Sequence, residues 1–141
     1  LYNRNYLKVK GAEQLKGAIM PITIIMGDCN YLKRVNDAYG HEYGDLLLKR
    51  VGRVIQENLP PESVALRMGG DEFLIACSHF SAEEAEQLIE RLHGELARQS
   101  DDRLKLDVAF GYHTVTEGPF DYTAVYHAAD RDMYRDKRKN R

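Results

Sequence analysis

The sequence lacks a long apolar run and an obvious targeting segment. No stretch approaches the roughly 20 apolar residues of a membrane-spanning helix, and no signal peptide is visible, so we expect no direct membrane contact by this segment. Cysteine is scarce, because Cys29 and Cys77 are the two cysteines of the chain and both lie in apolar runs. Two isolated thiols predict a reducing, cytoplasmic compartment and no disulfide framework. Any membrane anchor would then belong to another part of the parent protein.

A strong net charge is lacking too. The formal net charge is −2 at pH 7, which argues against a general nucleic-acid binder. Charge is unevenly spread, however, because the chain ends in the basic run Lys137-Arg138-Lys139-Asn140-Arg141. Repeats, linkers and low-complexity segments are absent and 43% of the 141 residues are hydrophobic, so we expect one domain over residues 1–141. The missing initial Met and the helical pattern at the start indicate a fragment of a longer protein.

Hydrophobic spacing predicts alternating helices and strands. Residues 1–17 have a helical pattern, and the β-branched run at 22–26 predicts a strand buried on both faces. Further along, the patterns predict a break at 36–45, an amphipathic helix that ends before Pro60, strands near 64–68 and 72–78, a helix with a capping box at 81–84, a strand at 105–110 with one buried face, a turn at 118–119 and a final helix from about Tyr122. This order favours an α/β (α+β) fold in which helices flank a central mixed or antiparallel sheet of about five strands.

The segment Gly69-Gly70-Asp71-Glu72 joins two strand-like runs and is the most informative stretch of the chain. Glycines between such runs predict a tight hairpin, because the central residues of the turn need positive φ. A turn needs at most one Asp, so turn formation alone does not explain the second carboxylate. Acids at a glycine-rich apex can hold a cation, and the missing side chains let a phosphate approach the backbone. The alternative is a solvated surface turn.

A third carboxylate, Asp28, follows the buried strand at 22–26. In α/β folds, ligands bind just beyond the carboxyl ends of strands. If this strand neighbours the hairpin, Asp28 and Asp71 face one another and would repel. A bound Mg²⁺ would relieve the repulsion, since hard cations favour carboxylates supplemented by water and substrate phosphate. The alternative is a set of unrelated surface acids.

Several motifs together resemble a known family. The pattern Asp28-x-Asn30-x-Leu32-Lys33-x-x-Asn36-Asp37-x-x-Gly40-His41-x-x-Gly44-Asp45, followed by Arg67-x-Gly69-Gly70-Asp71-Glu72-Phe73, is similar to the GGDEF domain of diguanylate cyclases. The resemblance extends from the opening Leu1-Tyr2-Asn3-Arg4 to the closing helix with Lys137. It implies a nucleotidyl-cyclase, polymerase-palm-like fold and a bacterial signal-transduction enzyme. Such an enzyme condenses two GTP into cyclic di-GMP and two pyrophosphates, as a homodimer with Mg²⁺ or Mn²⁺.

The resemblance also implies roles for individual residues. It implies metal ligands at Asp28, the backbone carbonyl of Cys29, Asp71 and Glu72. It implies catalytic roles for Asp71, Glu72 and Lys33, with Glu72 assisting deprotonation of the 3′-hydroxyl or binding a second metal. Phosphate contacts are implied at Lys33, Gly69, Gly70, Lys137 and Arg141. For the basic tail, a charged helix end favoured by the helix dipole is the alternative.

Asn36 and Asp45 match the family's guanine-binding residues. A carboxylate can accept two N–H groups from the Watson–Crick edge of guanine, and adenine offers no such pair. The alternatives are structural: Asn36 as a helix or turn cap, and Asp45 as the N-cap of a helix that begins at Leu46. Arg67 is not expected to touch substrate, and in the family it more often ties the hairpin to the N-terminal segment.

The chain departs from the family pattern at a few positions. Asn30 stands where an Asp is commonest, so a second metal site would lose a charge. Leu32 replaces a Phe, and Asn140 replaces a Gly. The family's inhibitory Arg-x-x-Asp reads Pro60-Pro61-Glu62-Ser63 here, so we expect no inhibitory site.

Three other functions stay open at this stage. A catalytically silent domain that binds GTP and regulates a partner would show a broken Gly-Gly-Asp-Glu-Phe or a lost Asp28, and both are intact. A cyclic di-GMP receptor would need the missing Arg-x-x-Asp. A module for dimerisation alone would not need Asn36, Asp45 and Lys33 together.

Overall fold

The computed structural model describes residues 2–3, 20–117 and 122–139. In this part of the chain, one sheet contains the strands β1 (Tyr2–Asn3), β2 (Ile22–Cys29), β3 (Ser63–Gly69), β4 (Glu72–Cys77) and β5 (Val108–Val115). Their order is β1-β3-β4-β2-β5, with β1 parallel to β3 and the other neighbours antiparallel. The helices are α3 (Leu32–Tyr39), α4 (His41–Glu57), α5 (Ala82–Gln99) and α6 (Tyr122–Lys139). The expected five-stranded mixed sheet with flanking helices is confirmed.

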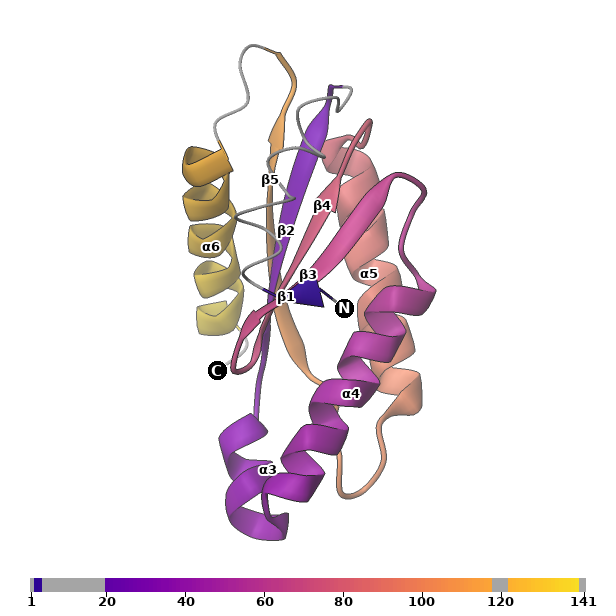
Figure 1. The fold of residues 1–141 in the computed structure, drawn as a ribbon, viewed down its shortest axis with the longest axis vertical. Helices are drawn as coiled ribbons and strands as arrows, with labels where there is room; N and C mark the ends of the chain where they lie inside the picture. The colour runs from indigo at the N-terminus through magenta and orange to yellow at the C-terminus, as the bar shows by residue number, and fades with distance from the viewer. Residues whose placement is uncertain (1, 4–19, 118–121, 140–141) are drawn as a thin grey trace.

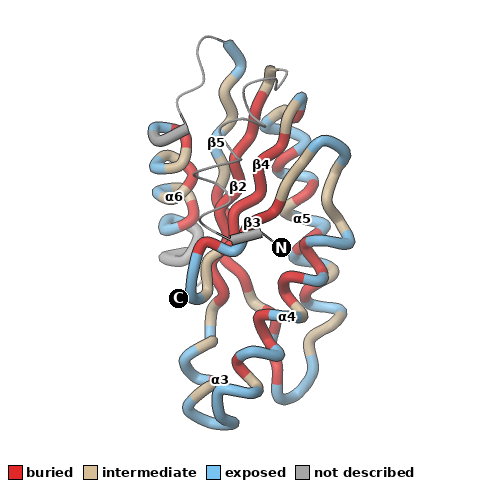
Figure 2. The backbone as a smooth tube through the Cα atoms, viewed as in Figure 1, coloured by how far each residue is buried: buried red, intermediate tan, exposed pale blue. Residues whose placement is uncertain are grey.

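Alternating residues of the strands supply two separate hydrophobic cores. Ile25, Phe73 and Ile75 pack in the core that includes the apolar faces of α4 and α5. Ile24 and Met26 pack in the core that includes α6. The sheet therefore lies between two helical layers, with buried strands at its centre (Figures 1 and 2). Because successive side chains of a strand point to opposite faces, the continuous apolar run in β2 is what a doubly covered central strand requires.

Two predictions need correction, and a third is not tested. Tyr2 and Asn3 form a strand beside β3, where a helix over residues 1–17 was expected, and the remainder of that segment lies outside the described residues. The strand at 105–110 was expected to have one buried face, but β5 is buried on both faces from Val108 to Gly111. A Cβ on Gly111 would collide with the backbone of α6, so this glycine permits the close packing of the helix. The turn at 118–119 lies outside the described residues.

The predicted break at 36–45 is also wrong, because a single residue separates α3 from α4. Gly40 has φ 92°, and its N–H donates to the Asn36 carbonyl over 2.9 Å. Positive φ is inexpensive for glycine, so one residue can turn the chain between the two helices. Asp45 consequently lies inside α4 and is not its N-cap, and neither α3 nor α4 has a side-chain N-cap bond. The capping alternatives for Asn36 and Asp45 are therefore wrong.

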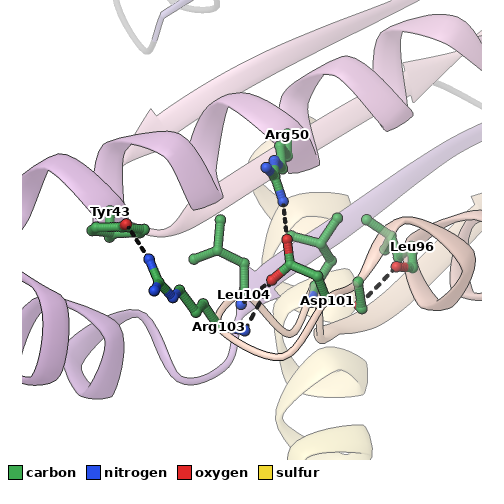
Figure 3. Close-up of polar contacts among 8 residues, drawn as sticks. Tyr43, Arg50, Leu96, Asp101, Arg103 and Leu104 are labelled. Carbon is green, nitrogen blue, oxygen red and sulfur yellow. Dashed lines mark hydrogen bonds and ion pairs between the residues drawn. The ribbon is translucent and has the colours of Figure 1, made fainter.

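A polar network fixes α4 to the connection between α5 and β5. The Asp101 carboxylate accepts the N–H groups of Arg103 and Leu104, over 2.9 and 2.8 Å, and the Arg50 guanidinium over 2.9 Å. Arg103 in turn donates to the Tyr43 hydroxyl over 2.8 Å (Figure 3). The bond from Arg50, followed by the two backbone bonds, lowers the pKa of Asp101 from 3.8 to about 2. The network holds the part of α4 that carries Asp45.

At the amino end of α5, the predicted capping box is confirmed. The Ser81 hydroxyl accepts the Glu84 N–H, and the Glu84 carboxylate accepts the Ser81 N–H. Of the described helices, none combines the length and the apolar character that crossing a membrane demands.

Candidate active site

The β3–β4 turn has the backbone that its glycines predict. Gly69 has φ 139° and Gly70 has φ 52°, values that favour glycine. Both are exposed, and no heavy atom lies within 4 Å of the place where a Cβ would be. Arg67 donates from Nε and Nη2 to the Gly70 carbonyl over 3.1 and 2.8 Å. The turn is thus held from one side by a forked donor and leaves its glycine backbone accessible.

The buried strand β2 runs directly beside this turn. Asp28 pairs in register with Glu72, and the Cys29 N–H donates to the Asp71 carbonyl over 2.9 Å. The expected proximity of this strand and the hairpin is confirmed. One detail is corrected: β2 continues to Cys29, so Asp28 lies within the strand and not just beyond it. Hydrogen bonding to β4 on one side and to β5 on the other extends the strand past the apolar run.

Candidate oxygen ligands for a hard cation lie on the paired backbones of β2 and the β3–β4 turn. Asp28 is 5% exposed, while Asp71 and Glu72 are half-buried. The described residues contain no group of three or more His, Cys, Asp or Glu side chains placed to hold a metal ion. This donor set fits Mg²⁺ or Mn²⁺ better than Zn²⁺, because hard cations accept one or two carboxylates supplemented by carbonyl, water and phosphate oxygens. Asn30, which follows β2, donates its N–H to the Asp107 carbonyl over 2.8 Å.

A second group of polar residues lies on α3 and α4, on either side of Gly40. We call this junction of the two helices the elbow. Lys33 is exposed on α3, and Asp45 is exposed near the start of α4. The Asn36 side-chain oxygen is buried and has no hydrogen-bond partner in the described part of the chain. Asp45 lines an open pocket of about 590 Å³ that also includes Arg67 of β3 and Phe73 of β4. The pocket therefore extends from α4 towards the strands of the hairpin.

Two predicted phosphate contacts cannot be compared with the structure. Lys137 belongs to α6, but its side chain lies outside the described residues, as does the whole of Arg141. Pro60 and Pro61 lie in the connection between α4 and β3 and border a pocket of about 510 Å³ with Glu57, Glu84 and Arg91. Arg91 donates to the Asn58 carbonyl over 3.3 Å. The absence of an inhibitory site stays a prediction.

The motifs in the sequence include Arg67 and Gly44, but the contacts of these two residues were not predicted. Arg67 donates to the carbonyl of Gly70 within the same turn, and Gly44 makes room for the Asn36 side chain. The role of Gly44 could have been suspected from the sequence, because a glycine inside an amphipathic helix lowers stability and is usually kept for packing or function.

The family model described as "Diguanylate cyclase, GGDEF domain" matches residues 1–141. The probable diguanylate cyclase DgcT of Escherichia coli strain K12 is 28% identical over 151 residues, covering 100% of this chain and 33% of that protein. Diguanylate cyclase DosC of the same organism is 28% identical over 126 residues, covering 86% of this chain and 27% of that protein. The chain thus spans about a third or less of the length of these relatives.

Solved structures agree with the family match. The GGDEF domain of DgcB from Caulobacter crescentus, in complex with c-di-GMP, has a TM-score of 0.85 at 24% identity and covers 100% of this chain and 88% of that one. The active GGEEF domain of a diguanylate cyclase from Vibrio cholerae has a TM-score of 0.82 at 25% identity, covering 99% and 92%. A microbial GGDEF domain studied for its interaction with cyclic di-GMP has a TM-score of 0.77 at 32% identity, covering 97% and 88%. With its palm-like sheet, its glycine hairpin and a family match over its whole length, the chain belongs to the GGDEF family of diguanylate cyclase domains.

Proposed function

We propose that this domain condenses two molecules of GTP into cyclic di-GMP and two pyrophosphates, with Mg²⁺ or Mn²⁺, across a homodimer. The observation that carries the proposal is the hydrogen bond from the Cys29 N–H to the Asp71 carbonyl, which joins the end of β2 to the hairpin. It places Asp28 beside an intact Gly-Gly-Asp-Glu-Phe turn. The diguanylate cyclase relatives support the same reaction, although they match only over about a third of their length.

One half of the site, made by the end of β2 and the β3–β4 turn, would hold the triphosphate; we call it the hairpin half. Asp28, Asp71 and the carbonyl of Cys29 would hold the metal, and Glu72 would assist deprotonation of the 3′-hydroxyl or hold a second metal. The bound metal would neutralise phosphate charge and stabilise the attacking and leaving oxygens. The open backbone at Gly69 and Gly70 gives a phosphate room to approach.

Further basic residues would complete the phosphate site. Lys33 is exposed on α3, so its ammonium group is free to contact a phosphate of GTP. Lys137 and Arg141 are proposed to add positive charge. Arg67 is proposed to hold the turn and not the substrate, since its Nε and Nη2 donate to the Gly70 carbonyl.

The elbow half would recognise the base. The exposed Asp45 carboxylate can accept two N–H groups from the edge of guanine, and Asn36, whose side-chain oxygen is buried, lies on the adjoining helix. Adenine offers no such pair of N–H groups to Asp45, so the site would discriminate against ATP.

Assembly is part of the proposal. Each protomer would bind one GTP, so a monomer holds half of the atoms that the two-fold product requires, and two half-sites must meet in a symmetric dimer. Turnover should therefore rise faster than linearly with protein concentration while the dimer is sparsely populated.

The test is to incubate the chain with GTP and Mg²⁺ and to identify the nucleotide product by chromatography over a range of protein concentrations. We expect cyclic di-GMP, formed at a rate that rises more steeply than protein concentration. Binding of GTP without any product would favour the silent regulatory domain. A strictly linear rate with a monomeric protein across the micromolar range would refute the dimeric mechanism.

A further inference from the structure

Gly44 occupies a position in α4 where glycine is unfavourable. It is buried in the helix, has no left-handed backbone angle and lies four residues after the Gly40 turn. In a helix interior, alanine stabilises more than glycine, because glycine loses more backbone entropy on folding. Neither the backbone conformation nor helix propensity therefore explains this glycine.

The space beside Gly44 is filled by one side chain. A Cβ at this position would collide with Asn36 Oδ1, and it would lie 2.8 Å from Cγ and 3.3 Å from Nδ2 of the same carboxamide. Because the whole group is too close, exchanging the amide oxygen and nitrogen would not remove the collision. At Gly111, by contrast, a Cβ would meet the backbone of α6. Gly111 is required by the packing of the fold, whereas at Gly44 a movable side-chain end is what stands in the way.

The carboxamide of Asn36 is held there without a bond to its oxygen. Asn36 Oδ1 is buried and has no hydrogen-bond partner in the described regions. Buried amide oxygens are nearly always hydrogen-bonded in folded proteins, because leaving one without a partner costs stability. No contact in the described residues offsets this cost, which is expected of a group that serves a ligand, and the missing Cβ is what leaves room for the carboxamide.

We propose that Gly44 is a positioning residue for guanine recognition: its missing side chain allows the Asn36 carboxamide to rest against α4 next to Asp45, where the amide can bond to the edge of the base. This inference rests on the proposed function and deepens it. An alanine at this position would displace the Asn36 amide while leaving both helices intact, since the end of a side chain can rotate away more easily than backbone can move.

The experiment compares Gly44→Ala with Gly94→Ala, a matched control. Gly94 is also helical, in α5, but is exposed with no heavy atom within 4 Å of its Cβ position. The probes are α,β-imido analogues of GTP and ATP, in which the bond that the proposed reaction breaks is replaced; they are titrated with Mg²⁺ by calorimetry, and thermal unfolding reports on the fold. We expect Gly44→Ala to weaken binding of the GTP analogue roughly five- to tenfold, the loss of about one hydrogen bond. Its Tm and its affinity for the ATP analogue should stay close to those of Gly94→Ala.

Asn36→Ala and the double variant complete the cycle. If Gly44 acts through Asn36, Asn36→Ala should weaken guanine binding by a similar factor, and adding Gly44→Ala to it should change nothing further. Unchanged guanine binding in Gly44→Ala would overturn the positioning role. So would a Gly44→Ala chain that unfolds while the double variant folds, because the space would then serve the fold. No binding of the GTP analogue by the unsubstituted chain would instead refute the proposed function itself.

Discussion

The two halves of the candidate site use glycine for opposite reasons. At the hairpin, Gly69 and Gly70 have positive φ and open space around them, so the backbone conformation is what excludes other residues. In α4, Gly44 has an ordinary helical backbone, and the Asn36 carboxamide fills the space. In the hairpin, glycine permits a backbone conformation that leaves space for a phosphate. In the elbow, glycine leaves space for the Asn36 side chain of the same protein. This difference fits a site that admits phosphate at one end and reads a base at the other.

The largest effect is expected from Asp71→Asn, in the hairpin half. The change keeps the size of the side chain but removes a charge where the transition state is most highly charged, so turnover should fall by about a thousandfold or more. The initial rate of cyclic di-GMP formation measures this, and thermal unfolding checks that the fold is intact. Near-normal turnover would remove Asp71 from the metal site.

Asp45→Ala should have the next largest effect, in the elbow half. Losing the acceptor for two guanine N–H groups should reduce the preference for GTP over ATP by roughly a hundredfold, with little effect on stability, because the side chain is exposed. Competition binding with the two nucleotides measures the preference. An unchanged preference would assign base recognition to other residues.

Gly69→Ala tests whether positive φ is the reason for glycine in the β3–β4 turn. With φ 139° and nothing near the Cβ position, the cost should come from backbone strain alone, about 1–3 kcal/mol of unfolding free energy. Chemical denaturation measures it, with Gly94→Ala as the control that should be neutral or stabilising. If both variants were equally stable, positive φ would not be the reason for glycine in the turn.

The smallest effect is expected from Asp101→Asn, outside both halves. Hydrogen bonds from Arg50 and the loop backbone lower the pKa of Asp101 from 3.8 to about 2, so the ionised form is favoured in the folded state. Its contribution to stability is present above about pH 4 and is lost as the pH falls towards 2. The Tm of the variant should therefore lie slightly below that of the parent at pH 6, and the difference should shrink on acidification. A difference that does not depend on pH would mean that the carboxylate charge is irrelevant to this network.

Local signals predicted the elements whose function is local. The glycines of the hairpin, the capping box at Ser81 and the apolar stripe of α4 each follow from backbone or helix chemistry, and each was found where expected. The limits of α3 were not predictable in this way. Val35 is the one residue of that helix that is fully buried, so its largely polar sequence resembles a loop.

Features set by tertiary packing could not be read from spacing. β5 looked half-exposed because charged residues alternate with apolar ones before it, yet Gly111 lets α6 cover its second face. The extension of β2 to Cys29 depends on pairing with β4 and β5, which lie far along the sequence. The same is true of the contact between Gly44 and Asn36, since it exists only once Gly40 has folded α4 back along α3.

The most direct test of the two-part site is one set of calorimetric titrations. A non-hydrolysable GTP analogue is titrated into the parent chain, Asp71→Asn and Asp45→Ala, each with and without Mg²⁺, and the ATP analogue is titrated in parallel. The account predicts that Asp71→Asn loses the enhancement by Mg²⁺ but keeps the preference for guanine, and that Asp45→Ala loses the preference but keeps the enhancement. If both variants lost the same property, or neither lost any, the division of the site into a phosphate half and a base half would be contradicted.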